Sequence, residues 1–177
     1  MWESGYALFD TAIGRCGVAW GPRGIVAVQL PERNPAATVA RLRRFGEEAE
    51  PPEEVRSAIT RMVAHLGGAV DDLVDIAVDP SEVPEFDRRV HEVARAIPPG
   101  ETLTYGEVAN RLGLPGSAQA VGQALGRNPY PIIIPCHRIL GANGKVGGFS
   151  AGEGAVTKLR ILGIEGAAPN GQPSLFD

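Results

Sequence analysis

The sequence has little cysteine and no long hydrophobic run. Only two cysteines occur among its 177 residues, far apart at positions 16 and 136. Such a pair does not make a disulfide framework, so a reducing compartment is the simpler interpretation. A membrane helix would need roughly eighteen or more consecutive apolar residues, and no such run occurs. The start, Met1-Trp2-Glu3, also lacks the basic segment of a secretory leader. We therefore expect a cytoplasmic or nucleoid-associated protein without a membrane segment.

The sequence also lacks an excess of positive charge. Its formal net charge is −4, which argues against nucleic-acid binding over the whole surface. Between residues 110 and 160, however, the only acidic side chain is Glu153. The basic side chains of that stretch are Arg111, Arg127, Arg138, Lys145, Lys158 and Arg160. They predict a local patch that can bind phosphate, with an ordinary solvated surface as the alternative.

The hydrophobic pattern predicts two domains of α+β character and a short tail. Apolar residues make up 44% of the chain and charged residues 21%, as in globular proteins. A small α+β domain is expected over residues 1–80, with strands at 5–9, 15–20, 24–30 and 73–78 and a helix around 55–66. A mostly helical domain is expected over residues 81–167. Residues 168–177 contain proline and glycine and show little periodicity, which predicts a disordered tail.

The second domain contains a helix-turn-helix pattern. Thr104 and Glu107 fit a capping box at the start of one helix, and Ser117 can cap a second helix that ends near Gly126. A glycine-containing turn joins the two, as in DNA-binding helix pairs. A helical hairpin packed only for structure is the alternative. In the preceding helix His91 belongs to no evident constellation, so we expect it to be exposed.

Nothing in the first domain amounts to a metal site. The carboxylates Asp10, Asp75 and Asp79 lie near predicted strand ends, but acidic residues there are usually solvated turn formers. Cys16 and His65 are too few for structural zinc, which needs four ligands. We therefore predict no metal.

The stretch from Asn128 to Ser150 contains the candidate nucleophile. Three consecutive isoleucines at 132–134 predict a short buried strand that Pro135 ends. Cys136 follows, with His137 and Arg138 beside it. A thiol is mostly protonated near neutral pH, and basic neighbours favour the reactive thiolate. A buried cysteine can also serve as a small hydrophobe, but the fixed backbone and basic neighbours favour a nucleophile.

The run Pro135-Cys136-His137-Arg138-Ile139 resembles the active-site signature of the O6-alkylguanine-DNA alkyltransferases. These are suicide repair proteins that move an alkyl group from guanine onto their own cysteine. Further blocks match in order along about half of the chain, which makes the resemblance more specific than the short motif alone. They are Phe86-Asp87-Arg88-Arg89-Val90, Ile97-Pro98 and Thr104-Tyr105-Gly106-Glu107-Val108-Ala109. Around the signature itself, the resemblance reaches upstream to Asn128 and downstream to Glu165.

The resemblance implies a fold and a set of roles. The first domain would be ribonuclease-H-like, and the second a winged helix-turn-helix-like domain that binds DNA. Cys136 would accept the alkyl group, His137 would act as a base through a water, and Glu165 would orient the imidazole. Asn128 would shape the active-site turn, and Tyr105 would donate a proton to the departing guanine. Val146, Phe149 and Ser150 would contact the flipped base. No cofactor is implied.

The same resemblance places DNA contacts on the second helix of the pair and near it. The thin helix would enter the minor groove of double-stranded DNA that contains O6-alkylguanine. The residues expected at this interface are Gln119, Gln123, Arg127, Arg138, Lys145 and Arg111. Two features depart from the family. Gln119 stands where an arginine usually replaces the flipped base, and the loop after Ser150 is two residues longer and carries Glu153.

Two other classes of function and one further partner are open. A Cys-His hydrolase would also use Cys136, and a non-catalytic sensor of alkylated DNA would share the DNA-binding face but would not need the thiol. The tail ends in a segment with Gln172, Leu175 and Phe176, whose spacing resembles the motif by which bacterial repair proteins bind the sliding clamp. A hydrophobic end that folds back on the first domain is the alternative. We expect the protein to act as a monomer.

Overall fold

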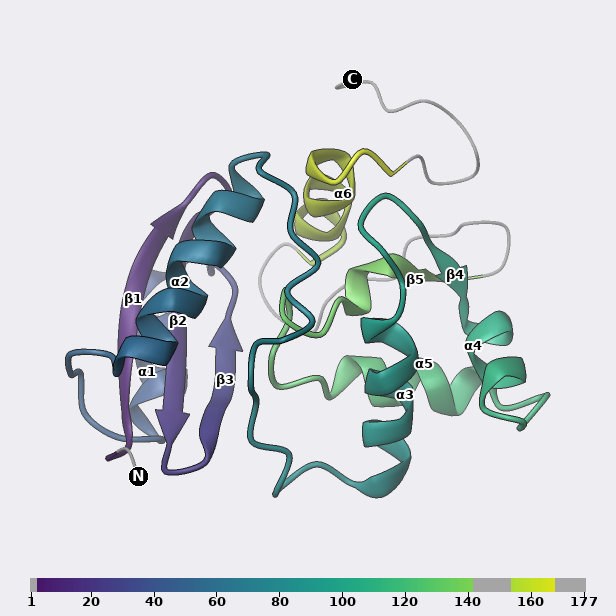
Figure 1. Ribbon diagram of the computed structural model, residues 1–177, viewed down its shortest axis with the longest axis horizontal. Helices are drawn as coiled ribbons and strands as arrows, with labels where there is room; N and C mark the ends of the chain where they lie inside the picture. Colours follow the sequence, from purple (N-terminus) through teal and green to yellow (C-terminus); the bar gives the residue numbers. More distant parts are fainter. Residues whose placement is uncertain (1–2, 142–153, 168–177) are drawn as a thin grey trace. The chain divides into compact units, whose positions relative to one another are not determined.

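The computed structural model describes residues 3–141 and 154–167. The chain divides into two compact units (Figure 1). The first comprises Met1–Glu82 together with Pro129–Ile133, and the second comprises Val83–Asn128 together with Ile134–Asp177. The short proline-rich segment before the cysteine therefore groups with the first unit, although the rest of the 81–167 region forms the second.

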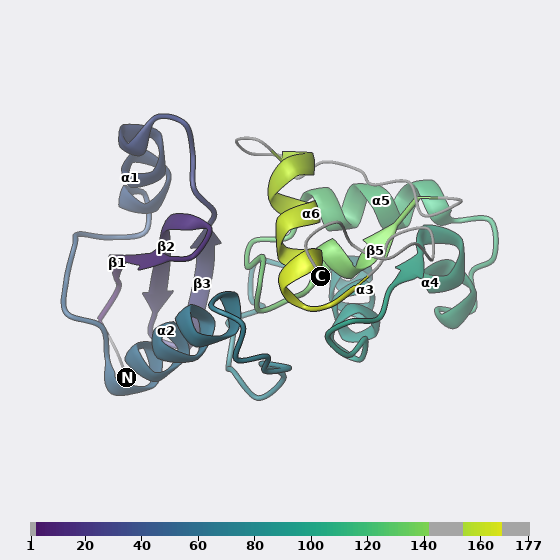
Figure 2. The ribbon, with the colours of Figure 1, turned by 90° about the horizontal axis from the view of Figure 1, so that it is seen from above.

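A three-stranded antiparallel sheet forms the centre of the first unit. Its strands are β1 (Gly5–Thr11), β2 (Gly14–Gly21) and β3 (Gly24–Gln29), in the order β1-β2-β3. The tight connections use Gly14 and Gly24, whose φ angles of 119° and 136° suit glycine. Helices α1 (Pro35–Arg43) and α2 (Glu53–Leu66) cover opposite faces of this sheet (Figure 2). The three strands and the second helix match the sequence prediction.

The fourth predicted strand, 73–78, is wrong. The only ladder contact of this stretch is an isolated bridge from Val78 to Ile25 on β3. Leu73 has a positive φ of 58°, which breaks the extended conformation, and its side chain is completely buried. The apolar residues therefore reflect burial of an irregular segment and not strand pairing.

The isoleucine run 132–134 is buried as predicted but does not form a strand. Ile132 has a φ of 78°, an unusual angle for a β-branched residue. Prolines at 129, 131 and 135 lack the amide hydrogens that a strand needs. The segment is instead held by single contacts: the Val28 amide donates to the Pro129 carbonyl, and the Tyr130 hydroxyl donates to the Asp79 carbonyl.

The second unit is mostly helical. Its elements are α3 (Glu85–Arg95), β4 (Leu103–Thr104), α4 (Tyr105–Arg111), α5 (Ala118–Gly126), the 3-10 helix η1 (Cys136–Arg138), β5 (Ile139–Leu140) and α6 (Gly154–Ile164). The predicted capping box at the start of α4 is present, because the Thr104 hydroxyl accepts from the Glu107 amide and the Glu107 carboxylate accepts from the Thr104 amide. Strands β4 and β5 pair in parallel and join α4 to the segment that carries the cysteine. None of the helices in the described ranges is long and apolar enough to cross a membrane.

The prediction that His91 is exposed is wrong. This side chain is 7% exposed, on the face of α3 that also buries Asp87, Val90 and Ala94. The spacing of four between Asp87 and His91 places both on one side of the helix. Burial lowers the pKa of His91, although the nearby Asp87 carboxylate acts in the opposite direction.

Candidate active site

Cys136 lies at the start of η1, directly after a tight turn. The φ and ψ angles of Pro135 are −81° and 64°, and the Cys136 amide donates to the Ile134 carbonyl across 2.8 Å. These values define an inverse γ-turn, which a proline stabilises by fixing φ. The cysteine is only 5% exposed. The thiol is therefore presented from a backbone with little conformational freedom.

Asn128 braces this turn from the end of α5. Its side-chain amide nitrogen donates to the Ile134 carbonyl across 3.0 Å. The same residue makes a side-chain hydrogen bond to Cys136 that favours the thiolate. Asn128 thus holds both the carbonyl that closes the turn and the sulfur that the turn presents.

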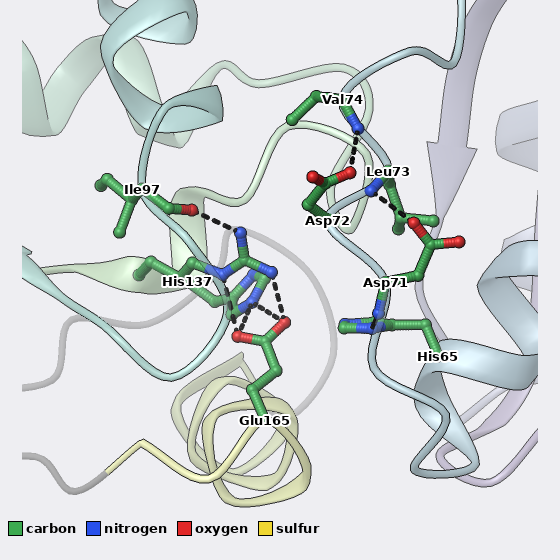
Figure 3. Close-up of polar contacts among 9 residues, drawn as sticks. His65, Asp71, Asp72, Leu73, Val74, Ile97, His137 and Glu165 are labelled. Atoms are coloured by element: carbon green, nitrogen blue, oxygen red, sulfur yellow. Dashed lines mark hydrogen bonds and ion pairs between the residues drawn. The ribbon is translucent and has the colours of Figure 1, made fainter.

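His137, Glu165 and Arg138 form a completely buried polar cluster (Figure 3). The His137 Nε2 atom lies 3.0 and 2.9 Å from the two Glu165 carboxylate oxygens. The guanidinium of Arg138 donates to the same two oxygens through Nε, across 2.9 Å, and Nη2, across 2.8 Å. One carboxylate at the end of α6 therefore orients both neighbours of the cysteine.

Arg138 was expected to tie the motif to the core or to the phosphates of DNA; the structure agrees with the core and not with the DNA contact. The side chain is 1% exposed, and its remaining nitrogen, Nη1, donates to the Ile97 carbonyl across 2.7 Å. A guanidinium engaged on every side by protein oxygens cannot reach a phosphate. It ties η1 to α6 and to the segment after α3, which agrees with a structural role in the core.

Burial raises the pKa of the Cys136 thiol. The hydrogen bond from Asn128 and the positive charge of Lys158 oppose this effect, as do the backbone amides of Cys136 and His137. The thiol is therefore mainly protonated, and a base is needed to generate the nucleophilic thiolate. His137 follows Cys136 in the chain, and Glu165 orients its ring through Nε2.

Lys158 is a site residue that the sequence interpretation missed. It was assigned to a basic surface patch, but it is 4% exposed and its ammonium donates to the Ile139 carbonyl across 2.9 Å. Burial lowers its pKa, while the nearby Cys136 raises it. One signal could have revealed its position: Lys158, Ile161, Leu162 and Glu165 follow the spacing of one helix face.

A substitution of Lys158 tests its effect on the thiol. Lys158→Met should raise the pKa of Cys136 further, because a nearby positive charge favours the thiolate. The rate of Cys136 alkylation by iodoacetamide, followed by mass spectrometry across a pH series, should then rise at higher pH than in the unmodified protein. Arg160→Met, an exposed position on the same helix, serves as the control. Superimposable profiles for Lys158→Met and the unmodified protein would contradict this role.

Tyr105 begins α4 near the thiol. Burial raises the pKa of its hydroxyl, and the negative potential of Cys136 adds to that shift. A Cβ atom at Gly122 would lie 3.5 Å from the Tyr105 ring, so the glycine of α5 permits the ring to pack closely. The phenol therefore remains protonated and can act as a donor.

The predicted DNA contacts divide into four groups: exposed, exposed but paired, buried, and outside the described residues. Gln119 and Gln123 are exposed on α5, and Arg111 is exposed in the last turn of α4. Arg127 is also on the surface, but its guanidinium is paired with Asp87. The basic patch is smaller than predicted, because Arg138 and Lys158 are buried. Lys145, Val146, Phe149, Ser150 and Glu153 lie outside the described residues.

The possible metal ligands of the first unit have other partners. No group of three or more histidine, cysteine or acidic residues suited to a metal occurs within residues 3–141 and 154–167. Asp71 and Asp75 pair with Arg61, and the pKa of Asp71 falls to about 2, mainly through its hydrogen bond with Arg61. Burial raises the pKa of Cys16 to about 11. The Nδ1 atom of His65 accepts from the Asp71 amide.

Comparisons with known proteins point to one family. The sequence model described as the DNA-binding domain of 6-O-methylguanine DNA methyltransferase matches residues 85–167. A methylated-DNA–protein-cysteine methyltransferase of Methanothermobacter thermautotrophicus is 35% identical over 156 residues, which cover 88% of this chain and 82% of the relative. The crystal structure of the Mycobacterium tuberculosis O6-methylguanine methyltransferase superposes with a TM-score of 0.72 at 31% identity, covering 92% of this chain and 93% of that one.

A second mycobacterial structure contains nucleic acid. The crystal structure of the Mycobacterium tuberculosis protein OGT in complex with DNA has a TM-score of 0.67 at 30% identity, covering 90% of this chain and 92% of that one. These matches define a class of DNA-modifying protein with a mixed α and β fold. The chain belongs to the methylated-DNA–protein-cysteine methyltransferase family.

Proposed function

We propose that this protein repairs alkylated DNA by moving the alkyl group from O6 of guanine to the sulfur of Cys136. The observation that supports this most is the cysteine itself, held on a rigid turn beside a histidine that a buried carboxylate orients. The Sγ–carbon bond forms as the carbon–O6 bond breaks, and the electron pair of that bond stays on guanine. A thioether is not hydrolysed, so each molecule acts once.

The proton movements balance across three side chains. His137 takes the thiol proton, through a water in the family, and Glu165 stabilises the imidazolium that forms. Because Glu165 engages Nε2, we expect the Nδ1 side of the ring to exchange the proton. Tyr105 gives a proton to the guanine ring as it departs, since a neutral base leaves more readily than its anion. The phenolate left on Tyr105 then regains a proton from solvent, and the His137 imidazolium gives one up to solvent. The site takes no cofactor in this scheme.

The second unit also fits the DNA-binding role. We assign residues 81–167 to a winged helix-turn-helix-like DNA-binding and alkyl-acceptor domain, and residues 1–80 to a ribonuclease-H-like domain. The target oxygen is inaccessible inside a duplex, so the alkylated nucleotide must be flipped out. We assign the exposed glutamines of α5 and Arg111 to the DNA interface. Lys145, Val146, Phe149 and Ser150 lie outside the described residues; we assign Lys145 to the phosphates and the other three to the flipped base. We further propose that the protein acts in the cytoplasm as a monomer.

The stoichiometry of transfer separates this function from its alternatives. Incubating the protein with excess duplex DNA containing radiolabelled O6-methylguanine should give about one methyl group per protein molecule and then stop. A Cys-His hydrolase would continue to turn over. A lesion sensor would bind the DNA and acquire no label. Either of these results would overturn the proposal.

Gln119 yields a prediction about base flipping. If the missing arginine charge limits flipping, Gln119→Arg should speed repair of duplex DNA by about tenfold and leave the reaction with free O6-methylguanine nearly unchanged, since one charged contact is worth about 1–2 kcal/mol. Gln123→Arg adds the same charge one turn further along the exposed face and should strengthen DNA binding without this selective gain. Equal acceleration on both substrates, or none on either, would defeat the explanation.

The tail suggests a further partner. Gln172, Leu175 and Phe176 lie outside the described residues, and their spacing in the sequence is what suggests a partner. We propose that they bind the sliding clamp weakly and concentrate the protein on replicating DNA. A peptide of residues 169–177 should bind purified clamp with micromolar affinity, and Leu175→Ala together with Phe176→Ala should remove that binding without changing alkyl transfer. A peptide that stays unbound at high concentration would leave the tail without this role.

A further inference from the structure

An ion pair between a buried aspartate and a half-exposed arginine joins two helices of the second unit outside the reactive cluster. Asp87, in the first turn of α3, is 2% exposed. Arg127, the residue at which α5 ends, donates to it through both arms of a fork: Nε to Oδ2 across 3.0 Å and Nη2 to Oδ1 across 2.9 Å. The two residues are forty positions apart in the sequence. The fork therefore fixes the end of α5 against the start of α3.

The two side chains of this ion pair differ in solvent exposure. The arginine side chain is 54% exposed, whereas the aspartate side chain is 3% exposed. A carboxylate in that position needs a hydrogen-bonded partner, because a buried unpaired charge is costly. The hydrogen bonds that Asp87 accepts in turn raise the pKa of Arg127. The planar fork also sets the direction of the guanidinium, which a lysine could not do.

Arg127 leads directly into the residue that braces the reactive turn. Its amide donates to the Ala124 carbonyl, and the amide of Asn128 donates to the Leu125 carbonyl. Both bonds keep the chain in a helical turn as it leaves α5. The Asn128 side chain then reaches the Ile134 carbonyl and the thiol of Cys136. A continuous set of contacts thus runs from Asp87 through Arg127 and Asn128 to the sulfur.

We propose that Asp87 and Arg127 are a positioning pair for Cys136, and that Arg127 is not primarily a phosphate contact. The proposal rests on the alkyl-acceptor role of Cys136 given above. The fork fixes the end of α5 so that the Asn128 amide stays within hydrogen-bond distance of both the turn carbonyl and the thiol. When the fork is lost, the thiol loses part of its alignment and part of the stabilisation of its thiolate.

Four variants test the pair in the full-length protein. Asp87→Asn and Arg127→Gln remove one partner each, their double variant removes both, and Arg127→Lys keeps the charge without the fork. The control is the exposed fork between Asp10 and Arg15, altered by Asp10→Asn and Arg15→Gln. Rates are measured on the folded fraction, well below the unfolding temperature, with free O6-methylguanine and with a duplex that contains it. DNA affinity is measured at several salt concentrations.

Each single variant of the pair should slow transfer to both substrates by about tenfold or more, since misplacing a reacting group by about 1 Å can cost about a hundredfold. The double variant should be no slower than the slower single variant, because the two residues act as a unit. Arg127→Lys should fold and still be slow. In each of the four variants, the pH profile of Cys136 alkylation by iodoacetamide should move to higher pH. A loss of stability alone would not produce this change. The control variants should match the unmodified protein.

Two results would overturn the proposal. If Arg127→Gln weakens DNA binding and lowers its salt dependence while Asp87→Asn does neither, Arg127 is a phosphate contact. If the folded single variants react at the unmodified rate with unmoved pH profiles, the fork serves stability only. The iodoacetamide profile does not depend on repair chemistry. A protein whose Cys136 never gains a methyl group would refute the proposed function and still leave the fork testable.

Discussion

Cys136→Ala is expected to lose all alkyl transfer while the protein keeps its fold and most of its affinity for DNA. In the proposed reaction the new bond forms to the sulfur of Cys136, which alanine lacks. Removing one sulfur atom from this nearly buried position should change the free energy of unfolding by about 1 kcal/mol. The test compares methyl transfer, thermal unfolding and binding to alkylated duplex DNA in the variant and the unmodified protein.

Cys16→Ala is the matched control for this experiment. Cys16 is also buried, in β2 of the first unit, and its pKa of about 11 makes it a poor nucleophile. That variant should transfer the methyl group at the normal rate. Residual transfer in Cys136→Ala would show that another residue accepts the alkyl group. A parallel loss of folding and DNA binding would show that Cys136 is structural.

Glu165→Gln should both slow alkyl transfer and destabilise the second unit. The carboxylate receives hydrogen bonds from His137 and from two nitrogens of Arg138, all in a buried cluster. The side-chain amide of glutamine has only one acceptor oxygen, and its NH2 group would face the N–H groups of His137 and Arg138, which are also donors. Leaving a buried guanidinium without its counter-charge should cost about 3–5 kcal/mol of unfolding free energy. Transfer should slow by about a hundredfold, since general base catalysis contributes about that much or more.

Unfolding and transfer must be measured separately to test this expectation. Thermal unfolding reports the loss of stability, and the transfer rate is taken at a temperature where the variant is folded. Glu107→Gln is the control, because a glutamine can still complete the capping box of α4. A Glu165→Gln protein with normal stability would show that Arg138 does not depend on the carboxylate. A normal transfer rate at neutral pH would remove Glu165 from the mechanism.

Local signals predicted the parts of the fold that depend on local chemistry. The strand periodicity of residues 5–30 and the capping pair of Thr104 and Glu107 depend on neighbours a few positions away, and both were confirmed. The strands predicted at 73–78 and 132–134 were wrong because a run of apolar residues reports burial and not backbone shape. Positive φ angles at Leu73 and Ile132 are set by the surrounding fold.

The polar core could not be predicted by the same means. Basic side chains are usually exposed, so Arg138 and Lys158 were assigned to the surface, yet Glu165 and the Ile139 carbonyl hold them inside. His91 was misplaced because its helix is charged along most of its length and its buried face is narrow. The pairing of Asp87 with Arg127 bridges forty residues. Only the family signature around Cys136 indicated which residues would meet at the site.

The most direct test of the central claim is the mass of the reacted protein, resolved to the residue. The full-length protein is incubated with duplex DNA containing O6-methylguanine, digested and analysed by mass spectrometry. A gain of one methyl group, about 14 Da, on the peptide that contains Cys136, with Cys16 unmodified and guanine restored in the DNA, is the predicted result. Restored guanine with an unmodified Cys136, or a methyl group on another residue, would contradict transfer to this cysteine.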